Sequence, residues 1–82
     1  MNAGNRPEAA YDGEHEGDTY TVQIFPTETK AAPRGKRQVM LRVRYRRRTA
    51  DFVEVVPRSF TEPFLHTLVR RLIDERWPAP PP

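Results

Sequence analysis

The sequence predicts a small α+β domain in which a three-stranded antiparallel sheet is followed by one helix packed on one face (β-β-β-α). Two observations carry this prediction. Three short segments alternate apolar and polar residues, as half-buried strands do, and a later segment repeats apolar residues at helical spacing. With 82 residues, of which 37% are hydrophobic, the chain provides for one small core. We therefore expect a disordered acidic arm over residues 1–18, the β-β-β-α domain over 19–77 and a proline-rich tail over 78–82.

The two ends are poor in residues that build a core. Residues 1–18 combine Gly, Asn, Pro, Ala and acids with a single aromatic, Tyr11. Burial of so little apolar surface does not offset the entropy lost when a backbone is ordered. The tail PAPPP cannot extend a helix because proline has no N–H to donate.

The first expected strand covers residues 19–25, TYTVQIF. Tyr20, Val22 and Ile24 alternate with Thr21, Gln23 and Phe25, and Pro26 ends the segment. We expect the first three side chains to face the helix and the second three to face away from it.

The second expected strand, residues 37–48 (RQVMLRVRYRRR), has the most regular pattern in the chain. Val39, Leu41, Val43 and Tyr45 occupy odd positions, which we place against the helix. The opposite side then carries Met40, Arg42, Arg44 and Arg46.

The third expected strand, residues 52–56 (FVEVV), follows a tight turn over 47–51. An unpaired carboxylate in an apolar core costs several kcal/mol, so we expect Glu54 to face outward. That orientation places Val53 and Val55 against the helix and leaves Phe52 and Val56 on the outer side.

The expected helix begins after Thr61, a residue that caps helix N-termini well, and has Pro63 in its first turn, where a missing N–H does no harm. It extends to about Arg76. Its apolar residues lie on one side at helical spacing: Leu65, Leu68, Val69, Leu72, Ile73 and Trp77.

Charge is strongly segregated along the chain. The formal net charge is only +3, yet residues 30–49 contain nine lysines and arginines and no carboxylate, whereas residues 1–29 are acidic. A polyanion would bind the middle third. The candidate binding residues are Lys36, Arg37, Arg42, Arg44, Arg46, Arg47 and Arg48, together with Gln23, Phe25 and Phe52.

This pattern favours a non-enzymatic nucleic-acid-binding domain, with duplex DNA preferred over RNA. Guanidinium groups bind phosphate oxygens, Gln23 is suited to a base edge, and Phe25 and Phe52 are suited to stacking on unpaired bases. In topology, the expected three strands and helix resemble the sheet-type DNA-binding modules of tyrosine recombinases and plant AP2-type factors. No sequence motif supports assigning residue roles from either. The hypothesis requires that the arginines point outward and are not already paired with carboxylates of their own chain.

The alternative is a protein-interaction module that uses the same face. Aromatic residues, Met and Arg are enriched in protein interfaces, and the partner would be an acidic protein or a second copy of this chain. A further alternative is that the acidic arm folds back over the arginines and screens them.

Other classes of function lack support in the sequence. Without cysteine, neither a disulfide nor a thiolate zinc site is available, which favours a reducing, cytoplasmic location, and no window approaches the roughly 18 apolar residues that span a bilayer. His15 and His66 have no further His or Cys nearby, so we expect neither a metal nor a cofactor. Ser59 and Thr61 are explained by helix capping, and we expect no catalytic residues and no enzyme.

Overall fold

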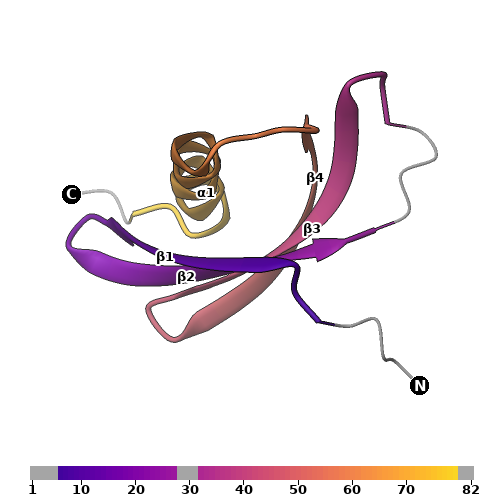
Figure 1. The fold of residues 1–82 in the computed structure, drawn as a ribbon. Helices are drawn as coiled ribbons and strands as arrows, with labels where there is room; N and C mark the ends of the chain where they lie inside the picture. Colours follow the sequence, from indigo (N-terminus) through magenta and orange to yellow (C-terminus); the bar gives the residue numbers. More distant parts are fainter. Residues whose placement is uncertain (1–5, 28–31, 80–82) are drawn as a thin grey trace.

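The computed structural model describes residues 6–27 and 32–79 and shows an antiparallel sheet with one C-terminal helix (Figure 1). The strands are β1 (Ala9–His15), β2 (Asp18–Pro26), β3 (Lys36–Tyr45) and β4 (Arg48–Pro57), in the order β1-β2-β3-β4. Helix α1 (Glu62–Arg76) lies across one face of the sheet. The predicted α+β class is confirmed, but with four strands in place of three. Within the described residues, no helix combines the length and apolarity needed to cross a membrane.

The additional strand is β1, so the prediction of a disordered arm is wrong for residues 9–15. Its side chains alternate between partly buried and exposed, and it pairs along its whole length with β2. Glu16 and Gly17, with φ of 51° and 86°, form the two-residue turn that pairs His15 with Asp18. Residues 1–5 of the predicted arm lie outside the described residues.

Gly13 allows β1 to pack closely against the centre of the molecule. It lies opposite Tyr20 on β2, and a Cβ at this position would overlap the Tyr20 hydroxyl and approach His66 Nδ1 to 2.9 Å. That hydroxyl is hydrogen-bonded to His66 Nδ1, and His66 Nε2 lies 3.1 Å from Glu62 Oε2. Burial raises the pKa of Tyr20, so the tyrosine remains a neutral partner for the histidine.

The core lies between the sheet and α1, and the predicted orientations of β2 and β3 are confirmed. Thr61 caps the helix as expected, because its hydroxyl accepts a hydrogen bond from the Phe64 N–H at 3.2 Å. At the other end, the Trp77 N–H donates to the Ile73 carbonyl at 2.8 Å. The buried side chains are Tyr20, Val22, Ile24, Val39, Leu41, Val43, Tyr45, Val56, Leu65, Leu68, Val69, Leu72 and Ile73.

The predicted orientation of β4 is wrong, and the turn before it gives the reason. Arg46 and Arg47, with φ of 52° and 64°, form a two-residue turn that pairs Tyr45 with Arg48, so odd residues of β3 face even residues of β4. Residues directly opposite each other share a face of the sheet.

This register exchanges the two sides of β4. Phe52 and Val56 lie on the helix side, whereas Val53 and Val55 lie on the outer side and are 58% and 49% exposed. Glu54 also lies on the helix side, opposite Val39, but it is only partly buried on this edge strand. The carboxylate therefore avoids the cost of full burial that suggested the opposite orientation.

We expect Arg47→Gly to stabilise the protein. An L-residue in the left-handed region costs roughly 1 kcal/mol, and glycine adopts that conformation freely. Chemical denaturation should show a gain of up to about 1 kcal/mol. Arg48→Gly is the matched control, because Arg48 lies in β4, where glycine costs roughly 0.5–1 kcal/mol. Equal losses of stability in Arg47→Gly and Arg48→Gly would contradict the left-handed backbone conformation of Arg47.

Candidate functional site

The sheet face turned away from α1, here called the outer face, carries Gln23, Phe25, Arg42 and Arg44 of the predicted binding residues. Because the four strands are in register, its side chains form cross-strand rows. One row is polar, the next pairs Gln23 with Arg42, and the third is apolar. These rows are Asp12–Thr21–Arg44–Thr49, Ala10–Gln23–Arg42–Asp51 and Phe25–Met40–Val53.

Arg42 is already paired within its own chain. Its Nε and Nη2 donate to the two oxygens of Asp51 on β4, at 2.9 and 3.2 Å. The guanidinium also lies 5.3 Å from the centre of the Phe25 ring, close enough for a cation–π contact. A phosphate would have to compete with both contacts.

Two further arginines of the predicted site also have carboxylate partners. Arg37 lies on the helix side of the sheet, opposite Val56, and donates two hydrogen bonds to Glu8 at 2.6 and 2.9 Å. Arg46 lies in the β3–β4 turn and not on the outer face, and it donates to Asp18 at 2.5 Å. Residues of the segment predicted to be a disordered arm therefore supply two of these three carboxylates.

The remaining cations of the predicted site are spread over several surfaces. Among the described residues, Arg44 has no carboxylate partner and points outward from the inner strand β3, one residue before that strand ends. Lys36 lies at the start of β3, Arg47 in the turn, and Arg48 on the helix side opposite Tyr45. The outer face also carries carboxylates that were not expected there, because β1 contributes Asp12 and Glu14.

The structure confirms that Gln23 and Phe25 lie on the outer face. Phe52 does not lie there, because it packs against the core cluster on the helix side. Thr21, Gln23, Arg42, Arg44 and Thr49 line a shallow hollow of about 290 Å³. Its walls are polar, so it suits a polar side chain or a phosphate better than an apolar ligand.

An apolar patch adjoins the hollow. It consists of Phe25, Met40, Val53 and Val55 and is here called the apolar row. Val53 and Val55 are two of the three exposed large hydrophobic residues of the described chain; the third is Phe64 on α1. A contiguous exposed apolar patch bordered by charged residues is typical of an interaction surface. Sequence reasoning missed Val53 and Val55 because it assigned them to the core.

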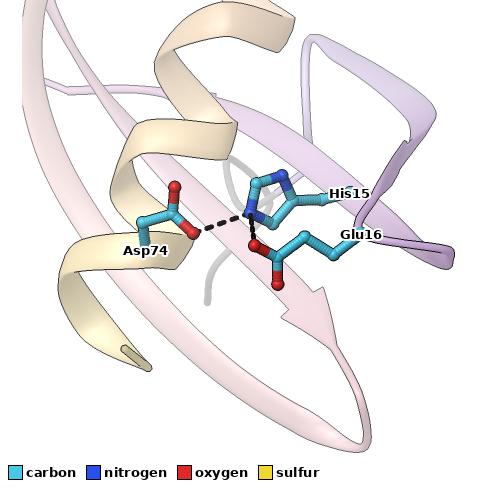
Figure 2. Close-up of side chains that lie close together, drawn as sticks. All are labelled: His15, Glu16 and Asp74. Atoms are coloured by element: carbon cyan, nitrogen blue, oxygen red, sulfur yellow. Dashed lines mark hydrogen bonds and ion pairs between the residues drawn. The ribbon is translucent and has the colours of Figure 1, made fainter. Parts of the chain in front are cut away.

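A second cluster lies where the β1–β2 turn meets the end of α1, and Figure 2 shows its three side chains. His15 Nε2 lies 2.7 Å from Asp74 Oδ1 and 3.9 Å from Glu16 Oε2. Beside it is a pocket of about 200 Å³ whose lining includes Tyr45, Arg48 and Trp77. Local sequence shows only the adjacent His15 and Glu16 of this cluster, because Asp74 is 59 residues from His15.

No protein family, curated protein or solved structure is significantly similar to this chain. The surfaces themselves are thus the basis for any functional conclusion.

We expect the Arg42–Asp51 pair to be visible in a carboxyl titration. The hydrogen bond from Arg42 holds the pKa of Asp51 below its usual value of about 3.9. The pair therefore stabilises the fold above that usual value, and the contribution is lost as the pH falls through the lowered pKa. Carbon-detected NMR of the Asp51 carboxyl should give a pKa that rises towards the usual value in Arg42→Met.

Arg44→Met provides the matched control, because it removes the same charge from the same strand but no contact with Asp51. An equal rise of the Asp51 pKa in both variants would mean that overall charge, and not the hydrogen bond, lowers it.

Proposed function

We propose that this chain is a non-enzymatic protein-interaction module whose outer face binds a second copy of the same chain. The apolar row is the observation that carries this proposal, because it leaves Val53 and Val55 in solvent beside Phe25 and Met40. Antiparallel sheets commonly keep one face in water, but such a face normally alternates polar residues outward. Exposed valines next to Phe25 and Met40 are better explained by a partner that covers them.

A twofold axis parallel to the strands makes the outer face complementary to itself. Rotation about such an axis places β2 of one copy over β3 of the other, so Phe25 of each copy faces Met40 of the other. Val53 and Val55 on β4 then lie towards the edge formed by the second copy's β1. Aligned packing of two sheets about 10 Å apart has this geometry.

The same arrangement gives the unpaired arginine a partner. Arg44 and Asp12 occupy the same cross-strand row, separated by Thr21. In the twofold dimer, Arg44 lies over the second copy's Thr21 and about 4.8 Å, one strand spacing, to the side of its Asp12. A guanidinium reaches a carboxylate over that distance. The mixture of carboxylates and arginines on one face thus favours self-association over binding to a partner of uniform charge.

The area available is sufficient for a specific dimer. Four strands about 4.8 Å apart and roughly 30 Å long present a flat area near 600 Å². The accessible area of a corrugated face is larger, and a standard interface buries about 800 Å² per partner.

We expect Val53→Glu to dissociate this dimer. Two carboxylates enter the apolar part of the interface, one from β4 of each copy, and more than a tenfold loss of affinity, about 1.4 kcal/mol, should follow. Sedimentation velocity over a wide range of protein concentration measures the effect. Thr67→Glu adds the same charge on the exposed side of α1 and should leave the dimer intact. A wild-type chain that remains monomeric at high concentration would reject the proposal.

The second candidate function is nucleic-acid binding, and one observation favours it. Arg44, Arg47 and Arg48 lie at the same end of the β3–β4 hairpin, and none has a carboxylate partner among the described residues. This site is smaller than the predicted one and does not include the paired Arg37, Arg42 and Arg46.

Salt dependence tests this second candidate. Three phosphate contacts predict a log–log slope of about −2.7 for duplex DNA, measured by fluorescence anisotropy. Arg44→Met should remove one phosphate contact and so reduce the magnitude of the slope by about 0.9. Val53→Glu should weaken DNA binding only through its added charge. The absence of binding at low salt, or a slope that Arg44→Met leaves unchanged, would reject it.

A further inference from the structure

The cluster at the β1–β2 turn has the ligand types and the convergence of a divalent metal site. His15 offers Nε2, and Glu16 and Asp74 each offer a carboxylate oxygen, all within 4.8 Å of one another (Figure 2). Zn²⁺ binds nitrogen and oxygen at about 2.0–2.2 Å, which places tetrahedral ligands roughly 3.4 Å apart. The observed separations of 2.7 and 3.9 Å lie on either side of that value, so small side-chain rotations suffice to bind an ion.

The fold already holds the imidazole in place. The His15 side chain is only 12% exposed, and its ring lies 5.9 Å from the ring of Tyr45. The Tyr45 hydroxyl donates to the His15 carbonyl at 2.9 Å, and Arg70 Nε donates to the Glu14 carbonyl at 3.1 Å. Since the hairpin end is tied to β3 and α1 in this way, an ion would not have to order the backbone.

The Glu16 side chain reaches the His15 imidazole because of the β1–β2 turn. Its φ of 51° reverses the chain directly after His15, and the side chain returns towards the imidazole (Figure 2). Asp74 comes from the last turn of α1, where the unpaired carbonyl ends of the helix favour a cation. Two elements far apart in sequence thus direct three ligands to one point.

The neighbouring charges limit the affinity. Arg46 and Arg48 line the adjacent pocket. Arg46 is paired with Asp18, which neutralises it, but Arg48 has no carboxylate partner among the described residues and opposes a second cation. One imidazole and two carboxylates favour a first-row divalent ion such as Zn²⁺ over Mg²⁺ or Ca²⁺, which need more oxygen ligands.

We propose that His15, Glu16 and Asp74 form a three-ligand site for a first-row divalent metal ion. The ion would bind His15 Nε2 and one oxygen from each carboxylate. Its remaining coordination position is open to water or an anion. This proposal concerns a different part of the molecule from the outer face and does not depend on self-association.

Titration of the 82-residue chain with ZnCl₂ alone tests the site. Calorimetry should give one saturable binding event, and ¹H–¹⁵N NMR should show shifts around His15, Glu16 and Asp74. Glu16→Gln and Asp74→Asn should each weaken Zn²⁺ binding roughly tenfold or more, since residues that merely orient metal ligands contribute that much. Both side chains are more than half exposed, so neither variant is expected to unfold the protein.

Glu14→Gln is the matched control. It removes one negative charge from the same hairpin but from the outer face, and Zn²⁺ affinity should change little. MgCl₂ should not reproduce the shifts. Equal effects of Glu14→Gln and Glu16→Gln, or the absence of saturable Zn²⁺ binding, would overturn the proposal and leave an ordinary His15–Asp74 ion pair.

Discussion

Two tight turns determine which side of the sheet each side chain occupies. In a strand, a shift of one residue moves every side chain to the opposite face, so the length of a hairpin turn determines the chemistry of both faces. The Arg46–Arg47 turn pairs odd residues of β3 with even residues of β4. Val53 and Val55 are exposed for this reason alone, and the apolar row depends on it. The Glu16–Gly17 turn has the same role for β1 and places Asp12 and Glu14 on the outer face.

Elements with a strong, self-consistent pattern are predictable from the sequence. Alternation in β2 and β3 correctly identifies the buried side chains, and helical spacing together with the Thr61 cap correctly identifies α1. The orientation of β4 is not predictable in this way. Alternate residues on both of its sides are apolar, and the Arg-Arg turn lacks the Asn-Gly or Asp-Gly sequence that usually indicates a two-residue hairpin. Glu54 alone therefore indicates the wrong side, because a residue on an edge strand can face the helix and still contact water.

Strand β1 is not predictable from the local sequence, because its composition is typical of a loop. Gly13 and the acidic residues lower its strand propensity, and only Tyr11 is a large apolar residue. Its stability comes from tertiary contacts that a local reading does not contain, namely pairing with β2 and the contacts of the hairpin end with Tyr45 and α1. The error in β1 also affects the candidate site. Counting charges along the chain shows a basic middle third, but Asp18 and Glu8 reach Arg46 and Arg37 across the fold and neutralise them.

The close approach of β1 at Gly13 has a consequence for related sequences. A tyrosine at position 20 whose hydroxyl bonds to His66 leaves no room for a side chain at position 13. Evolution can therefore change these two positions only together: a homologue with alanine or a larger residue at 13 must carry a shorter residue at 20. Such a homologue would also need a different partner for the histidine on its helix, so positions 13, 20 and 66 should co-vary among related sequences.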